Sequence, residues 1–385
     1  MKIAIVAVGY NRKESISRLL ASLNNGNYLG ESITLVISID KSNTSVVETF
    51  ADSFEWKHGE KIVDKHEKNL GLREHMLSLT KWFDLFDVLI VLEDDIIVAP
   101  TFYSFVVQTT QKYFNDENIA GISLYSFFVN YQNSELFVPY KNEYDTYFMN
   151  CAMSWGQVWM KKQWLSFVDW YKEHLDFVNL DHLPKAICEW PKSSWLKYHT
   201  RYCIEQNKFF VYPYYGYSTN CGAVGTHNKK TDSSYQVPMQ MGNIKTLKLP
   251  DFGDEAVYYD GFFENTALYS HLGYSPQDCC IDLNGCKCNR EGKQYWLTTH
   301  CMNYKIEKSF GLDFRPIELN IMMNNKGRDI FLYNTKIAEK QRFSNDYARI
   351  LLYKYYLSSV ITFLKKYGFV NLIRAFFEKI FSKFK

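Results

Sequence analysis

Three consecutive carboxylates, Glu93, Asp94 and Asp95, are the residues of this sequence best placed to do chemistry. They follow the apolar run of residues 88–92, which is typical of a short buried strand in a parallel sheet. Ligands of open α/β sheets bind where such strands end. Because clustered carboxylates repel one another and are costly to bury, a cation or a donor-rich ligand is their natural partner. The alternative is a solvated acidic turn, and the preceding strand favours the ligand site.

The chemistry of these ligands predicts a hard divalent ion. Carboxylate oxygens suit Mn²⁺ or Mg²⁺, which commonly bind one or two carboxylates and complete their shell with phosphate and water. The acidic triplet therefore predicts a site for a metal-bound phosphate compound.

Residues 92–95, followed by Ala-Pro-Thr-Phe at 99–102, resemble the signature of GT-A nucleotide-sugar glycosyltransferases. The similarity is greatest to the inverting N-acetylglucosaminyltransferase I type and to bacterial surface-polysaccharide enzymes, and it covers about residues 1–230. It implies a Rossmann-like GT-A fold and a UDP-linked donor. It also implies that Asp95 holds the metal on the donor diphosphate, that Asp94 contacts the ribose and that Glu93 lies closer to the sugar.

The turn after the first apolar run is a second candidate donor contact. The run ends in Val8, Gly9, Asn11 and Arg12, and a helical pattern follows. Such a turn offers backbone N–H groups to a nucleotide and a guanidinium to a base or a phosphate. A plain turn between strand and helix is the alternative. The resemblance favours the nucleotide, because the family's first strand ends in a similar Asn-Arg pair beside the base.

Four further residues are predicted to face the donor. Asp40 ends the apolar run 34–39, where it can accept a hydrogen bond from a base or a ribose, or serve as a helix cap or loop acid. Arg73 resembles a basic residue of the family that faces the nucleotide. Trp155 and Gly156 resemble the family's Trp-Gly element at the sugar pocket, and a buried Trp at a helix start is the alternative.

The catalytic base is the point where the resemblance fails. Inverting relatives carry an acid just before a Trp at the start of a late helix, and the matching positions here are Ser193 and Ser194. Serine does not act as that base near neutral pH without an activator. We expect Glu189 to take the role. Asp181 is the second candidate, with a helix cap as its alternative.

Two histidines and a group of cysteines complete the candidates. His227 resembles a late histidine that some GT-A enzymes bring to the metal or the diphosphate, and a structural role is its alternative; His199 is expected to be structural. Five cysteines lie between 279 and 301: Cys279, Cys280, Cys286, Cys288 and Cys301. Their spacing fits the paired ligands of structural zinc poorly, so buried thiols are the preferred interpretation.

The chain is expected to form three parts. Residues 1–125 are predicted to bind the nucleotide sugar, residues 126–335 to bind the acceptor and close the fold, and residues 336–385 to form a helical tail. From Phe363 onward, apolar side chains recur at helical spacing among basic ones, which predicts an amphipathic helix on an anionic membrane surface. Packing on the protein itself, or on a second copy in a homo-oligomer, is the alternative. We see no secretory signal or spanning run, so we expect a cytoplasmic protein, peripheral at the inner face of the cell membrane.

Together these features predict an α/β enzyme with a mixed, mainly parallel sheet flanked by helices. The predicted reaction is metal-assisted, inverting transfer of a hexosyl or N-acetylhexosaminyl group to a hydroxyl of a glycan or lipid-linked acceptor, as in polysaccharide biosynthesis. A sugar nucleotidyltransferase is one alternative, although the turn after the first strand is too poor in Gly and Lys for it. A carbohydrate-binding protein that has lost catalysis is the other. A net charge of +2 gives no support for nucleic-acid binding.

Overall fold

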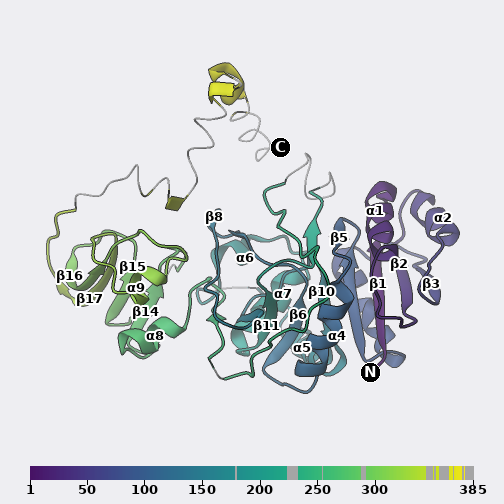
Figure 1. Ribbon diagram of the computed structural model, residues 1–385, viewed down its shortest axis with the longest axis horizontal. Coiled ribbons are helices and arrows are strands. Elements are labelled where there is room, and N and C mark those ends of the chain that lie inside the picture. Colours follow the sequence, from purple (N-terminus) through teal and green to yellow (C-terminus); the bar gives the residue numbers. More distant parts are fainter. Residues whose placement is uncertain are drawn as a thin grey trace. The chain divides into compact units, whose positions relative to one another are not determined.

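The computed structural model describes residues 1–177, 180–222, 233–253, 255–287 and 292–343, and also 350, 353–354, 364–366, 368–374 and 377. The chain forms two compact units (Figure 1). The first comprises Met1–Phe128, Lys141–Gly222 and Ser233–Ala267, and the second contains Val129–Tyr140 and the described residues from Leu268 onward. This division differs from the predicted boundaries at 125 and 335, because most of the segment from 141 to 267 joins the sheet of the N-terminal half.

The first unit is built on a nine-stranded sheet with the order β13-β9-β11-β6-β10-β4-β1-β2-β3. The strands are β1 (Ile3–Gly9), β2 (Thr34–Ile39), β3 (Lys61–Lys65), β4 (Val88–Glu93), β6 (Ile119–Ser123), β9 (Thr146–Met149), β10 (Gln157–Met160), β11 (Phe209–Pro213) and β13 (Tyr258–Tyr259). Strands β1 to β4 are mutually parallel, whereas β10 runs antiparallel between β4 and β6. The predicted α/β architecture with a mixed, mainly parallel sheet is confirmed.

Strands β1 and β4 are apolar along nearly their whole length because both of their faces are buried. Their register sets the position of the candidate site. Gly9 pairs with Ile39 of β2, and Val8 pairs with Glu93 of β4. The C-terminal ends of β1, β2 and β4 therefore lie at the same level, side by side in the sheet.

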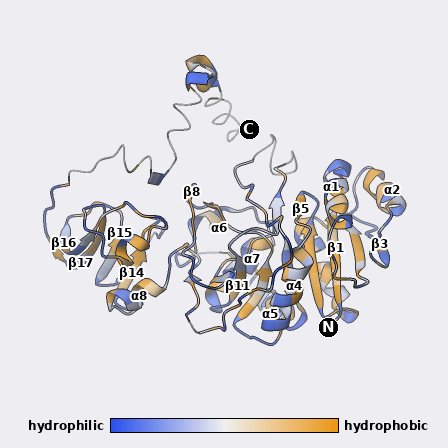
Figure 2. Ribbon diagram, viewed as in Figure 1, coloured by the Kyte–Doolittle hydropathy of each residue, from blue (hydrophilic) through white to orange (hydrophobic). Residues whose placement is uncertain are grey.

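Helices flank the sheet on both sides (Figure 1). They are α1 (Lys13–Asn24), α2 (Val46–Ser53), α3 (Leu72–Ser78), the 3₁₀ helix η1 (Leu79–Asp84), α4 (Phe102–Tyr113), α5 (Lys161–Glu173), α6 (Lys185–Glu189) and α7 (Leu196–Glu205). The predicted apolar stripe of α1 is buried, since Ile16, Leu19 and Leu23 are fully covered. Figure 2 shows hydrophobic strands between helices that carry both kinds of residue. The first unit also contains a short ladder formed by β5 (Ile96–Val98) with β12 (Ser218–Asn220), and the second unit contains one formed by β7 (Val129–Asn130) with β8 (Glu135–Leu136).

The second unit has its own four-stranded sheet in the order β14-β15-β17-β16. Its elements are α8 (Ala267–Leu272), β14 (Cys279–Asp282), β15 (Tyr295–Thr298), β16 (Tyr304–Phe310), α9 (Leu319–Met322) and β17 (Ile330–Ala338). Cys279 and Cys280 are buried on β14, as expected for structural thiols, while Cys301 is exposed. Cys288 lies outside the described residues.

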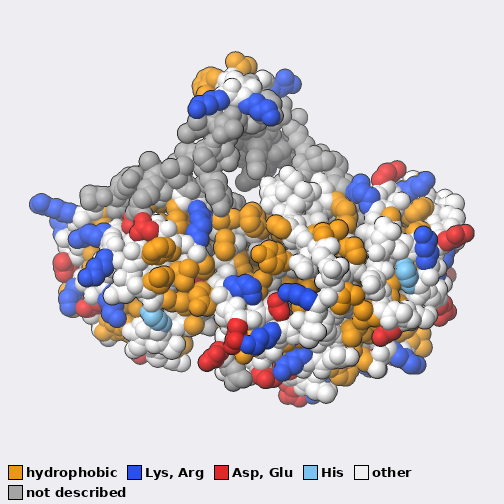
Figure 3. Space-filling view, viewed as in Figure 1, with side chains coloured by type: hydrophobic (Ala, Val, Ile, Leu, Met, Phe, Trp, Pro, Cys, Tyr) orange, Lys and Arg blue, Asp and Glu red, His pale blue; other side chains and the backbone are white. Residues whose placement is uncertain are grey.

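The predicted tail helix falls only partly within the described residues. Residues 364–366 and 369–374 are helical, and the side chains of Phe369 and Val370 are 63% and 77% exposed. Figure 3 shows hydrophobic and basic side chains together on this segment, which is yellow in Figure 1. None of the described helices is both long enough and apolar enough to cross a membrane.

Candidate active site

Arg12 and the acidic triplet meet at the C-terminal ends of β1 and β4. The Nε atom of Arg12 donates to Asp94 Oδ2 at 3.1 Å, and its Nη2 atom forms a close ion pair with Asp94 Oδ1. The same Nη2 lies 3.3 Å from Asp95 Oδ2. The guanidinium therefore holds Asp94 in a two-point contact and also reaches Asp95. The ends of the two strands thus bring Arg12, Asp94 and Asp95 together.

Burial raises the pKa values of Glu93 and Asp94 by different amounts. It raises the pKa of Glu93 to about 8, with a further rise from the charge of Asp95, while a hydrogen bond with the Ser154 hydroxyl opposes the shift. Burial likewise raises the pKa of Asp94 to about 6, and the hydrogen bond and charge of Arg12 oppose it. Burial therefore favours the protonated form of Glu93 more strongly than that of Asp94. A buried, protonated carboxyl can donate a hydrogen bond to a ligand, which an ionised one cannot do.

The turn that precedes β10 forms another side of the site. Because β10 is antiparallel to β4, its N-terminal end lies where β4 ends, and Gln157 pairs with Val91. Gly156 has φ of +99°, and a Cβ there would lie 2.8 Å from Ser218 Oγ and 3.1 Å from Leu124 Cβ. Ser218 Oγ donates to the carbonyl of Trp155 at 2.5 Å. The Trp-Gly element is therefore a tight turn that requires glycine, and it leads into a strand rather than directly into a helix.

Two residues at the site were missed by the sequence analysis. The β5–β12 ladder pairs Asn220 with Ile96, and the next amide, that of Cys221, donates to the carbonyl of Asp95 at 2.7 Å. Burial raises the pKa of the Cys221 thiol, and the charge and hydrogen bond of Arg18 on α1 oppose that shift. Arg18 could have been proposed as a second basic residue on the helix after the nucleotide turn. Cys221 reaches the site through long-range pairing, which leaves no local signal.

Asp40 lies at the same end of the strands, after β2, but backbone groups already bind its carboxylate. Oδ1 accepts from the amides of Lys41 and Leu70 at 2.8 Å each, and Oδ2 accepts from the amide of Gly71 at 2.9 Å. These bonds fix the loop before α3, where Gly71 has φ of +73°. Because each carboxylate oxygen has two acceptor positions, contact with a donor stays a prediction for Asp40.

Arg73 contacts the segment before α7 rather than the acidic triplet. Its Nη1 atom donates to the carbonyl of Lys192 at 2.9 Å, and its guanidinium lies 5.8 Å from the ring centre of Tyr198. The contact brings the segment that carries Ser193 and Ser194 to the start of α3. Arg73 therefore links the loop shaped by Asp40 to the region where the catalytic base is expected.

The two proposed bases are both accessible. Glu189 ends α6, its side chain is 64% exposed, and it pairs with Lys185 at 3.6 Å. Asp181 is exposed before α6. His227 lies outside the described residues. His199 is fully buried and stacks on Phe167 at 4.2 Å, which agrees with the structural role expected for it.

Two cations of α7 hold the chain around Glu189. Lys197 Nζ donates to the carbonyls of Trp190 at 3.0 Å and Cys188 at 3.4 Å. Arg201 Nη1 donates to the carbonyl of Asp176 at 2.6 Å. Both side chains are largely buried, at 3% and 8% residue exposure. They fix the path of the segment before α7, and Glu189 lies between the two Lys197 contacts.

A divalent ion fits this site only in part. Asp95 is the more accessible aspartate, with 19% side-chain exposure against 8% for Asp94. Within the described ranges, no group of three or more His, Cys, Asp or Glu side chains is arranged to hold a metal. One carboxylate together with phosphate oxygens and water is nevertheless a common shell for Mg²⁺. The residues therefore fit an ion that a bound phosphate ligand completes.

Comparisons with known proteins give structural matches but no sequence matches. No protein-family model and no curated protein sequence matches the chain. Solved structures do match: *S. aureus* TarS in complex with UDP is 14% identical, with a TM-score of 0.36, over 57% of this chain and 60% of that one. GalNAc-T7 with UDP, GalNAc and Mn²⁺ is 15% identical, with a TM-score of 0.36, over 56% and 42%. The mannosyltransferase PcManGT from *Pyrobaculum calidifontis*, in complex with GDP-Man and Mn²⁺, is 9% identical, with a TM-score of 0.36, over 55% and 54%.

The matched region spans less than two thirds of the length of each of these three proteins.

Proposed function

We propose that this protein is a metal-assisted glycosyltransferase. It would transfer a hexosyl or N-acetylhexosaminyl group, with inversion, from a UDP-linked donor to a hydroxyl of a glycan or lipid-linked acceptor. The observation that carries the proposal is the meeting of Arg12 with Asp94 and Asp95 where two parallel strands end. Cations and accessible carboxylate at one sheet edge suit a diphosphate and the ion bound to it.

Each donor-side residue has a proposed role. A divalent ion at Asp95 would offset the charge that grows on the leaving diphosphate, and His227 is proposed as its second ligand. Arg12 and Arg18 would bind phosphate oxygens, and Asp94 the ribose. Glu93, when protonated, would donate a hydrogen bond to a sugar hydroxyl beside the Trp155–Gly156 turn. Val8, Gly9, Asn11, Asp40 and Arg73 are proposed to surround the nucleoside.

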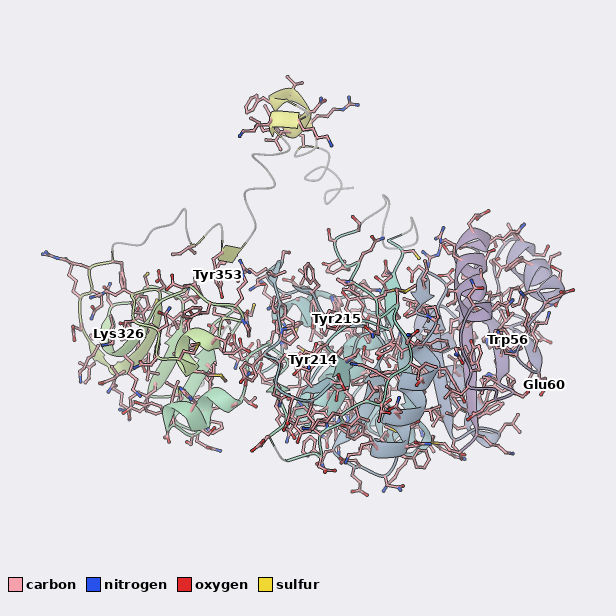
Figure 4. The ribbon with its side chains drawn as sticks, viewed as in Figure 1. Trp56, Glu60, Tyr214, Tyr215, Lys326 and Tyr353 are labelled. Carbon is pink, nitrogen blue, oxygen red and sulfur yellow. The ribbon has the colours of Figure 1, made fainter. Side chains whose placement is uncertain are left out.

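The acceptor side is proposed to use the loops after β6 and β11. Tyr214 and Tyr215 follow β11 (Figure 4), and Tyr215 is 61% exposed. Ser126 Oγ donates to the carbonyl of Tyr214 at 3.2 Å, so the two loops lie together. An exposed aromatic ring on a fixed loop, such as that of Tyr215, suits packing against the apolar face of a sugar. Glu189 would take the proton of the acceptor hydroxyl, with Asp181 as the second candidate.

One observation favours a second candidate function. Serines occupy the place at which a base is expected, and Glu189 pairs with Lys185. A carbohydrate-binding protein that keeps the donor site and lacks turnover would show both features. Turnover with a suitable acceptor separates the two functions.

We further propose that the tail binds anionic membranes and keeps the enzyme at the inner face of the cell membrane. The exposed Phe369 and Val370 supply apolar surface beside the exposed Lys365. Apolar burial and attraction to anionic lipids strengthen each other at a bilayer surface. Formation of a homo-oligomer through the same segment is the alternative.

The donor site is tested by calorimetry with UDP in the presence and absence of Mn²⁺ or Mg²⁺. Wild-type protein should bind UDP more tightly with the ion. Asp95→Asn should lose most of that gain, because an amide is a weaker ligand than a carboxylate. Asp84→Asn, an exposed change at the end of η1, is the matched control. Unchanged metal-dependent affinity in Asp95→Asn contradicts the metal assignment, and failure of UDP, GDP and their sugars to bind contradicts the proposed function.

A further inference from the structure

Arg12 occupies the carboxylates that a metal ion would need. Its guanidinium binds both oxygens of Asp94 and approaches Oδ2 of Asp95 to 3.3 Å. We infer that Arg12 is the resident counter-ion of the acidic triplet, and that it makes metal binding depend on the donor. This inference rests on the proposed function, since it concerns the same site. It assigns the order of binding: the divalent ion becomes tightly bound at Asp95 only after a diphosphate has drawn Arg12 away.

A metal ion on Asp95 and the guanidinium of Arg12 would lie close to each other. A Mg²⁺-like ion binds carboxylate oxygen at about 2.1 Å, so an ion on Asp95 Oδ2 would stand no more than roughly 5.5 Å from Arg12 Nη2 in its present position. The side chains concerned are 25%, 8% and 19% exposed for Arg12, Asp94 and Asp95. Water therefore screens the repulsion between the two cations only partly. With Arg12 in place, the acidic triplet disfavours a divalent ion.

A diphosphate has the chemistry needed to displace Arg12 from the carboxylates. A guanidinium presents a planar pair of donors that matches the oxygens of a phosphate as well as those of a carboxylate. A diphosphate offers several such oxygens and carries more negative charge than Asp94. It also supplies the remaining oxygen ligands of the ion, which the described residues do not supply by themselves. One ligand thus removes the competing cation and completes the metal shell.

Arg12 is the N-cap residue of α1. Its carbonyl accepts from the amide of Ile16 at 3.1 Å, but its side chain makes no capping hydrogen bond to the helix. Its backbone follows the end of β1, which both neighbouring strands hold. A side-chain rotation can therefore transfer the guanidinium from Asp94 to a phosphate without moving a helix or a strand.

The test measures Mn²⁺ binding by the full-length protein, with the unbound ion counted by electron paramagnetic resonance. Wild-type protein should bind Mn²⁺ weakly alone and on the order of tenfold more tightly or better with saturating UDP. Arg12→Gln should bind Mn²⁺ alone on the order of tenfold more tightly than wild type, because the competing charge is gone. UDP should then add less to the affinity for Mn²⁺. Lys13→Gln removes the same charge from the neighbouring exposed position and should behave as wild type.

Arg12→Lys is the second variant, since it keeps the charge and loses the planar fork. It should hold Asp94 less firmly and give a Mn²⁺ affinity between those of wild type and Arg12→Gln. A folded Arg12→Gln protein that binds Mn²⁺ no more tightly than wild type overturns the inference, as does an equal increase in Lys13→Gln. The measurement of Mn²⁺ binding without nucleotide does not depend on whether UDP is the donor. Tighter Mn²⁺ binding by Arg12→Gln therefore supports the counter-ion role even if UDP fails to bind, whereas that failure counts against the proposed function.

Discussion

Protonation of His199 should limit the stability of the first unit in mild acid. The imidazole is fully buried, and neither ring nitrogen has a hydrogen-bond partner in the described part of the chain. Aromatic rings surround it, with Phe167 at 4.2 Å, Phe210 at 5.2 Å and Trp164 at 5.5 Å. Burial lowers its pKa from 6.5 to about 3. The folded state thus keeps His199 neutral at a pH where the unfolded chain binds a proton.

The sign and size of the effect follow from this difference. The pKa of His199 is lower in the folded state, so the unfolded chain binds a proton first as the pH falls. The free energy of unfolding is therefore highest above pH 6.5 and decreases as the pH falls from 6.5 towards 3. Between pH 7 and pH 5 the loss attributable to His199 is about 2 kcal/mol. His199→Phe removes the titration and also two unpaired polar atoms, whose burial costs about 1–3 kcal/mol. The variant should therefore be more stable than wild type at pH 7, and the gap should widen at pH 5.

Urea unfolding followed by tryptophan fluorescence is a suitable assay, because eight of the nine tryptophans lie in the first unit. The informative quantity is the difference in unfolding free energy between wild type and His199→Phe at each pH. Other groups that titrate cancel in that difference. His271→Gln, at an exposed position of α8, is the control. An equal loss of stability in wild type and His199→Phe between pH 7 and pH 5 refutes the reasoning.

Three further predictions concern the turn, the base and the tail. Gly156→Ala should destabilise the first unit by about 1–3 kcal/mol in urea unfolding; Gly253→Ala, at φ of +101° with no described atom within 4 Å of its added Cβ, should cost less, and equal losses would show that backbone strain alone is responsible. Glu189→Gln should lower kcat by about 10²-fold or more with little change in UDP affinity, because a base acts in the chemical step; Asp169→Asn, at an exposed position of α5, is the control, and near-normal turnover in Glu189→Gln removes it as the base. Protein truncated before Phe363 should keep its UDP affinity and no longer float with anionic liposomes, whereas full-length protein should float at low salt and less at high salt; full-length protein that stays unbound at low salt directs attention to self-association.

The sequence predicts those parts of the fold that depend on local pattern. The apolar runs at 34–39 and 88–92 become β2 and β4, and the stripe of α1 is buried as expected. The acidic triplet is also foreseeable, because its position depends only on the strand before it. In contrast, the contact between Arg12 and Asp94 joins residues 82 positions apart and depends on the register of β1 with β4. No local periodicity contains that information.

The same reason explains the residues and boundaries that sequence analysis missed. Cys221 reaches Asp95 because β12 pairs with β5, and both are strands of three residues without a clear pattern. The sheet of the second unit also lies in a stretch for which no fold was predicted from sequence. Strands β9, β11 and β13 follow the predicted boundary at 125 and return to the first sheet. Such returns depend on tertiary packing of several short segments.

The hydrogen bonds from α7 to the segment before it suggest how related proteins could come to prefer different acceptors. Lys197 and Arg201 bind the carbonyl oxygens of Asp176, Cys188 and Trp190, and these are atoms that every residue type possesses. The path of the segment is therefore largely indifferent to which side chains it carries. Substitutions at exposed positions such as Glu189 can alter what the segment recognises while its backbone stays in place. For protein engineering, this makes the segment before α7 a suitable stretch to randomise, provided that the two cations are left untouched.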